Sequence, residues 1–179
     1  LGYELSDRTV IVKWRVKNPA DTRMYFAIGG HPAFLCPIEQ DTKQCDYKIR
    51  FDTKEQVVSS GLANGLVTDN DEIYALQDGA LPITEHLFDG DALVIEHDQA
   101  HSVSLVKPDG TDYLTVTFDA PLFGIWSPPK KQAPFICIEP WYGRCDRAGY
   151  EGDWKEREWM QMLEGKETFA ADYKVTIQD

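Results

Sequence analysis

The chain has 179 residues and a formal net charge of −12 at pH 7, with 42% apolar and 12% aromatic residues. This length and composition are typical of one globular domain with a buried core, and they argue against a disordered chain. The negative charge repels nucleic-acid phosphates and anionic lipid surfaces, so we expect a neutral small molecule as partner, with no nucleic acid and no membrane.

Targeting and cysteine usage indicate a cytoplasmic protein. No apolar run approaches the length of a membrane span, and no signal peptide precedes the first strand-like segment. The four cysteines form no CxxC pair, which favours buried free thiols, with one or two disulfides as the alternative. The chain starts at Leu1 and enters a strand-like pattern at once, so we expect it to be a piece of something longer.

Alternation of apolar and polar residues predicts short strands along the first part of the chain. The first strand covers residues 10–16, a turn follows at residues 18–21, and residues 24–28 return along it. Residues 47–51 form another strand, and residues 61–71 are predicted as a loop or short hairpin.

The rest of the chain continues in the same way. Further strands are predicted at residues 81–88, 92–96, 102–107, 113–118, 122–126, 135–138 and 169–177, and only residues 154–163 could form a helical turn or two. Many short strands, ten prolines and thirteen glycines predict an all-β sandwich or barrel, with residues 1–179 as a single domain.

One carboxylate stands out in residues 135–143, whose sequence is FICIEPWYG. Glu139 interrupts an apolar, strand-like run, where an ionised carboxylate is costly unless it is paired or protonated. Such a setting raises the pKa of a carboxyl group toward the working range of a general base. The structural alternative is that Arg144, Arg147 or a backbone amide holds Glu139.

A second unusual stretch is residues 28–34, with sequence IGGHPAF. Its two glycines allow the backbone to approach a ligand closely, and Pro32 fixes the backbone beside His31. Phe34 would then supply an apolar wall. A purely structural histidine is the alternative. We expect His31 and Glu139 to meet across one pocket as an acid–base pair.

Three other residues suit a sugar ligand. Trp126 and Trp141 offer flat apolar faces that match the C–H face of a pyranose, although aromatic residues in such a fold are more often part of the core. Asp91 follows the turn at Asp89 and could accept hydrogen bonds from sugar hydroxyls.

Other chemistries find little support in the sequence. His97 and His101 have the i, i+4 spacing of a helical metal pair, but their segment is predicted as strand and turn, so we expect no metal and no cofactor. His86 is interpreted as an ordinary strand residue. The sequence contains no P-loop, no GxGxxG, no GxSxG and no catalytic-cysteine signature.

Four motifs together resemble the aldose 1-epimerase (galactose mutarotase) family, in its bacterial branch of mutarotase-related proteins. They are IGGHPAF at 28–34, DGDAL at 89–93, LFGIWS at 122–127 and CIEPWYG at 137–143. The resemblance runs through essentially all 179 residues and keeps the motif order. It implies an antiparallel β-supersandwich, here without its N-terminal portion.

The resemblance also implies roles for three residues. His31 matches the general acid on the ring oxygen, Glu139 matches the general base on the anomeric hydroxyl, and Asp91 matches the aspartate that holds sugar hydroxyls. Family members are longer on the N-terminal side, where a substrate-binding arginine and a further histidine reside, so neither is carried over here. Gly124 takes the place of a glutamine found in many galactose mutarotases, so galactose is not assumed as substrate.

The function implied is an isomerase that interconverts the α and β anomers of an aldohexose or sugar phosphate, with a bell-shaped dependence of rate on pH. A non-catalytic sugar-binding or sensor domain is the first alternative, and a metal-dependent β-barrel enzyme is the second. A homodimer is compatible with the sequence.

Overall fold

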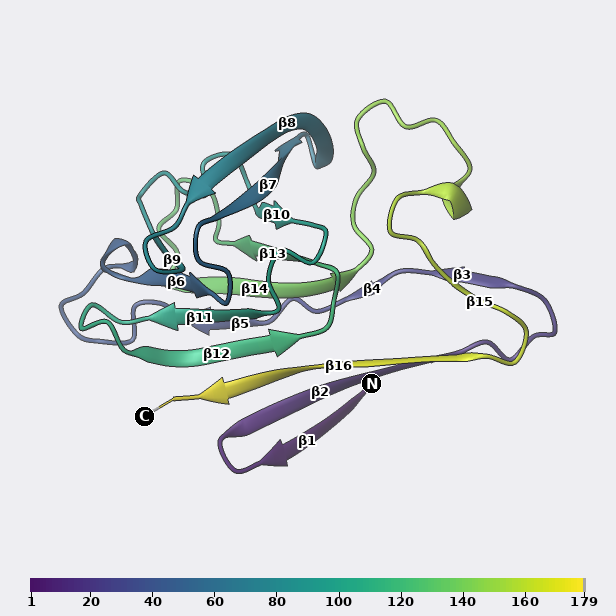
Figure 1. Ribbon diagram of the computed structural model, residues 1–179, viewed down its shortest axis with the longest axis horizontal. Coiled ribbons are helices and arrows are strands. Elements are labelled where there is room, and N and C mark those ends of the chain that lie inside the picture. The colour runs from purple at the N-terminus through teal and green to yellow at the C-terminus, as the bar shows by residue number, and fades with distance from the viewer. Residues whose placement is uncertain (179) are drawn as a thin grey trace.

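The computed structural model describes residues 1–178, which are built mainly from antiparallel strands arranged in two large sheets and one small one (Figure 1). The first sheet has the order β1 (Gly2–Ser6), β2 (Thr9–Lys17), β16 (Thr168–Ile177), β12 (Asp112–Phe118), β11 (Ser102–Val106), β6 (Lys48–Phe51) and β9 (Ala80–Pro82). The prediction of an all-β protein is confirmed.

The second sheet has the order β4 (Ile28–Gly29), β14 (Phe135–Tyr142), β13 (Leu122–Trp126), β10 (Leu93–Ile95), β7 (Gln56–Ala63) and β8 (Leu66–Ala75), and β5 (Ala33–Leu35) also pairs with β14. A two-stranded sheet of β3 (Met24–Phe26) and β15 (Gln161–Leu163) lies beside them. Short 3-10 turns occupy Gln44–Asp46 and Trp154–Glu156. No helix of the described residues is long and apolar enough to cross a membrane.

One hydrophobic core joins the two large sheets. Residues of the first sheet, such as Ile49 and Leu105, and residues of the second, such as Ile125 and Ile138, belong to the same buried cluster. Because side chains alternate along a strand, β14 buries Ile136 and Ile138 in this core and turns the residues between them to the other face. That outer face of the second sheet carries the candidate site.

Residues 24–28 do not return along the first predicted strand, so that part of the strand prediction is wrong. β2 pairs with β1 and β16, whereas β3 pairs with β15. The buried side chain of Asn18 explains the difference, because its amide donates to the carbonyl oxygens of Thr22, Leu163 and Glu164. The turn is therefore tied to the end of β15 and not closed as a hairpin.

Residues 61–71 form a hairpin, which the sequence offered as an alternative to a loop. They lie within the long β7–β8 hairpin, whose turn is made by Asn64 and Gly65, both with positive φ. Two other boundaries differ from the predictions. β9 ends at Pro82, and the predicted strand does not continue to residue 88. Residues 154–163 hold one 3-10 turn, but the end of this range is the strand β15.

Candidate active site

His31 lies in a gap between two short strands that pair with β14. Gly29 of β4 pairs with Trp141, and Ala33 of β5 pairs with Cys137. Between them, Gly30 donates to the carbonyl oxygen of Pro140 at 2.9 Å, and Pro32 accepts from the amide of Ile138 at 3.3 Å. The gap therefore faces residues 138–140 and brings His31 to Glu139, 108 positions away in the chain.

The same gap explains how a proline fits inside β14. In a strand, the nitrogen and the carbonyl oxygen of one residue point to the same side, and the Pro140 carbonyl points toward Gly30. The missing N–H of Pro140 therefore faces the gap, where no strand partner needs it. This is why β14 runs on to Tyr142 and does not stop before the proline.

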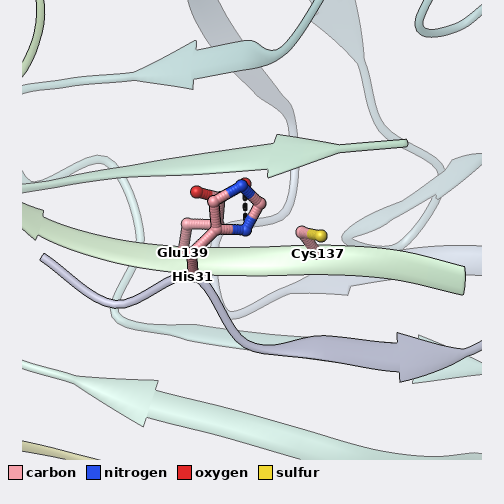
Figure 2. Close-up of side chains that lie close together, drawn as sticks. All are labelled: His31, Cys137 and Glu139. Atoms are coloured by element: carbon pink, nitrogen blue, oxygen red, sulfur yellow. Dashed lines mark ion pairs between the residues drawn. The ribbon is translucent and has the colours of Figure 1, made fainter. Parts of the chain in front are cut away.

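The expected meeting of His31 and Glu139 is present in the geometry. His31 Nδ1 lies 3.3 Å from Glu139 Oε1, and Figure 2 shows the two side chains converging above β14. Their surroundings differ strongly, because the His31 side chain is 63% exposed whereas that of Glu139 is only 6% exposed. An accessible imidazole and a buried carboxylate thus meet at the surface of the sheet.

Burial raises the pKa of Glu139 to about 7, far above its usual value. A hydrogen bond from Trp141 works against this rise, and the negative charge of Asp91 adds to it. Glu139 can therefore accept and return a proton near neutral pH.

Trp141 lies against the sheet where two glycines leave room for its ring. A Cβ atom at Gly29 would stand 2.6 Å from the indole, and one at Gly124 would stand 2.3 Å from it. Neither position could carry a side chain without displacing the indole. Gly124 pairs with Glu139 in the register of β13 and β14, so the indole covers the floor of the site beside the carboxylate.

Trp126 and Phe34 occupy different faces of the sheet. The Trp126 ring meets the His31 ring edge to face, with centroids 5.8 Å apart. Phe34 pairs with Ile136 and is packed against the core, so it does not form the predicted apolar wall beside His31.

Asp91 lies at the edge of a second cavity and not among the residues that line the cavity of His31 and Glu139. Its carboxylate accepts from the amide of Ala92 at 2.9 Å, and its φ of 91° lies in a region that side chains rarely adopt. It remains close enough to raise the pKa of Glu139.

The donor atoms of His31, Cys137 and Glu139 lie within 4.8 Å of one another, a spacing at which three donors could hold a metal ion. Figure 2 shows Cys137 farther along the same strand. Burial, with a contribution from the charge of Glu139, raises the pKa of the Cys137 thiol to about 12. Since a metal binds the thiolate, an ion at these three donors would have to displace the proton of this thiol.

The cavity beside the pair has a volume of about 490 Å³ and includes residues that the sequence did not single out. Leu62 of β7 and Val94 of β10 form part of its wall, together with the segment 143–145. This volume lies in the range of small-molecule sites. Only pairing across β7, β10, β13 and β14 brings these residues together, so their positions in sequence gave no signal.

Arg144 and Arg147 do not hold Glu139. Arg144 pairs with Glu96 and Glu158, and Arg147 pairs with Asp69 and Glu158. Within residues 1–178, the closest ionisable partner recorded for Glu139 is His31. The alternative in which Glu139 is a structural ion pair is thus not the arrangement observed.

The other histidines have separate neighbours. His86 contacts Asp89 at 2.8 Å, and His101 lies 3.8 Å from Asp98. The His97 ring packs against Trp159, with centroids 5.2 Å apart.

Comparison with known proteins places this arrangement among relatives. No protein-family model matches the chain. The chain is 32% identical to the plasmid and chromosomal forms of protein LacX from Lactococcus lactis subsp. lactis over 146 residues, which is 79% of this chain and 48% of the relative. It therefore spans about half the length of the curated relatives it matches.

Two solved structures cover nearly the whole chain. A galactose mutarotase related enzyme from Lactobacillus acidophilus matches 99% of it with a TM-score of 0.86 and 29% identity, and the match covers 60% of that protein. A galactose mutarotase-like protein from Lactobacillus casei ATCC 334 matches 98% of it with a TM-score of 0.83 and 27% identity, covering 61% of that protein.

These matches define the class of protein. The chain has the antiparallel β fold of the galactose mutarotase-like proteins. The resemblance to the aldose 1-epimerase (galactose mutarotase) family, drawn from the four motifs around His31, Asp91, Gly124 and Glu139, is confirmed.

Proposed function

We propose that this chain carries the acid–base pair of an aldose 1-epimerase-like isomerase, which interconverts the α and β anomers of a hexose. The observation that carries the proposal is the contact between exposed His31 and buried Glu139, 3.3 Å apart, with the pKa of Glu139 raised to about 7. The mutarotase-related names of the matched structures support it.

The closeness of the pair fits the chemistry of a cyclic sugar. The ring oxygen and the anomeric hydroxyl are both bonded to C1, so an acid for one and a base for the other must work side by side. Glu139 takes the proton of the C1 hydroxyl while His31 donates a proton to the ring oxygen. The bond between C1 and the ring oxygen breaks, and C1 becomes an aldehyde.

Rotation about the bond between C1 and C2 then presents the other face of the aldehyde. The ring oxygen attacks that face, His31 takes its proton back, and Glu139 returns a proton to the new C1 hydroxyl. Each group ends as it began, so only protons move during the cycle. General acid–base assistance of this kind contributes about 10²–10⁴-fold to rate, and holding the sugar against the pair adds more.

Polarimetry on freshly dissolved α-D-glucose and α-D-galactose tests the proposal, with this chain and with a version extended to the length of its relatives. We expect accelerated mutarotation that His31→Asn and Glu139→Gln each reduce by about 10²-fold or more. Asp112→Asn, in the first sheet, should leave the rate unchanged. Unreduced acceleration in both site variants would contradict the assigned roles.

A sugar-binding or sensor domain is the competing function, because the cavity and its aromatic residues would serve binding alone equally well. Binding of glucose by calorimetry separates the two. An enzyme with Glu139→Gln loses rate and keeps much of its affinity. If the extended protein binds the sugar and gives no acceleration, the sensor function replaces the proposed one.

A further inference from the structure

One guanidinium group borders the candidate active-site cavity. Among the described residues, Arg144 is the only Lys or Arg that lines it. The neighbouring cavity next to Asp91 is lined by Glu72, Asp89 and Asp91 and by no Lys or Arg of the described chain. An anionic group on a substrate would therefore depend on Arg144 for a guanidinium partner.

Every nitrogen of Arg144 is already engaged. Its Nε donates to Glu96 Oε1 at 2.7 Å, its Nη1 donates to the Cys145 carbonyl at 2.8 Å, and its Nη2 donates to Glu158. The side chain is only 3% exposed. Two carboxylates thus surround this guanidinium, and one of them, Glu158, is shared with Arg147.

Glu96 is built to stay ionised in this arrangement. Its side chain is 3% exposed, and it also accepts from Ser60 Oγ at 2.6 Å and from the indole nitrogen of Trp159. Burial alone would raise the pKa of Glu96, but the hydrogen bonds from Arg144, Ser60 and Trp159 outweigh burial and hold the pKa below its usual value. Its charge is therefore present at neutral pH.

A buried ion pair is a weak source of stability, because desolvation offsets much of the attraction. Here the pair has a second consequence. Arg144 is the kind of group that binds phosphate in proteins, since its planar fork matches phosphate oxygens. With Nε and Nη2 donating to carboxylates and Nη1 donating to a carbonyl, the cavity offers no free guanidinium to a phosphate.

We propose that Glu96 and Glu158 are specificity-determining residues that mask Arg144, so that the site accepts uncharged sugars and discriminates against sugar phosphates. This inference rests on the proposed function for the identity of the sugar. The masking itself is tested by phosphate binding, which requires no turnover.

Calorimetry with glucose, glucose 6-phosphate and inorganic phosphate on the full chain provides the test. The unaltered protein should bind glucose at least about tenfold more tightly than glucose 6-phosphate, which corresponds to about 1.4 kcal/mol. The double variant Glu96→Gln/Glu158→Gln should bind both phosphate compounds at least about tenfold more tightly than the unaltered protein.

Adding Arg144→Met to that double variant separates masking from a structural role. If masking is correct, the gain in phosphate binding disappears, because the cation itself has been removed. A matched control is Asp112→Asn, which frees Arg50 in the first sheet and should create no phosphate binding that glucose displaces.

If the double variant does not melt cooperatively, the single variant Glu158→Gln replaces it in the test. Glu158 is half-exposed, and its substitution frees Nη2 of Arg144. A smaller gain in phosphate binding is expected from it. Equal binding of glucose and glucose 6-phosphate by the unaltered protein would overturn the proposal. So would the absence of any gain in the unmasked variants, or a gain that survives Arg144→Met. If the unaltered protein does not accelerate mutarotation but the phosphate-binding results are as expected, only the proposed function is contradicted.

Discussion

At the scale of single residues, the site depends on one unequal pair. His31 is exposed to solvent, and Glu139 is buried at the surface of the second sheet. The burial that makes the carboxylate costly to ionise also brings its pKa to about 7, which suits the proposed role of a base near neutral pH. Two predictions follow directly from that balance.

The rate of mutarotation should rise as the pH increases through about 7, because Glu139 must be ionised to take the proton of the C1 hydroxyl. Initial rates by polarimetry, corrected for the buffer reaction, measure this limb of the pH profile. A rate that stays flat from about pH 5 to about pH 9 would contradict the role of Glu139 as base.

The stability of the folded chain should fall as the pH rises, in contrast to the rate of mutarotation. Since the pKa of Glu139 is raised from 4.5 to about 7, its contribution is fully present below about pH 4.5 and is lost as the pH rises through about 7. Glu139→Gln removes this loss. Relative to that variant, the unaltered chain should lose about 3 kcal/mol of unfolding free energy as the pH rises from about 4.5 to about 7. This figure is the difference between the two pKa values converted to free energy.

Urea unfolding of both proteins at about pH 4.5 and about pH 8 measures the effect. The difference in unfolding free energy between the two should shift in favour of Glu139→Gln at the higher pH. An unchanged difference would show that the carboxylate is not strained by burial.

At the scale of elements, the site needs three strands whose surfaces are shaped for one indole. Gly29 on β4 and Gly124 on β13 flank Trp141 on β14, and a Cβ atom at either glycine would overlap the ring. The position of the ring depends on the absence of side chains on both neighbouring strands.

Gly124→Ala should therefore displace Trp141 and destabilise the chain by about 1–3 kcal/mol, which is the usual cost of overpacking. The Michaelis constant for the sugar should rise because the floor of the site moves. Thermal melting and polarimetry measure the two effects. Gly2→Ala on β1 is the control, since its Cβ would meet only Lys13 at 3.8 Å, and an equal loss in both variants would rule out this explanation.

Part of this arrangement could be predicted from the sequence. A carboxylate in an apolar run and a histidine beside two glycines are local signals, and they identified Glu139 and His31. The face of the sheet on which Phe34 lies could not be predicted, because β5 has only three residues and the gap before it interrupts the alternation of side chains. The Glu96–Arg144 pair was missed because it joins residues just beyond the ends of β10 and β14, and the sequence alone does not bring these two strand ends together.

The predicted pairing of residues 24–28 with the first strand failed for a similar reason. Alternation located β2 and β3 well, but it does not state which strands pair. The hydrogen bonds of the Asn18 side chain to Leu163 and Glu164 decide that partner, and they join residues 145 and 146 positions apart in the chain.

At the scale of the whole molecule, the first sheet ends in the exposed edge strand β1. β1 pairs with β2 on one side only, and the side chains of Tyr3 and Leu5 on this strand are exposed, as is that of Leu1 just before it. Figure 1 shows this strand at the margin of the molecule, away from the second sheet. An exposed apolar edge strand pairs readily with another chain.

We therefore expect the 179-residue chain to self-associate, and to do so more strongly at high salt, because screening weakens the mutual repulsion of chains with a net charge of −12. Sedimentation velocity at low and high salt measures this. Leu5→Lys should reduce the association, whereas Lys54→Gln, away from β1, should not. A monodisperse, cooperatively melting chain under both conditions would contradict the prediction.

The position of His31, in the gap between β4 and β5, depends on a small part of the fold. His31 is held by strands of two and three residues and by the two backbone hydrogen bonds at Gly30 and Pro32, whereas Glu139 lies within the eight-residue strand β14 and pairs with Gly124 of β13. Segments with so few anchoring contacts open far more often than the core around them. We therefore expect the Gly30 amide to exchange its hydrogen faster than the amides of the core, and we expect a warmed sample to lose the contact between His31 and Glu139 while its two sheets are still intact.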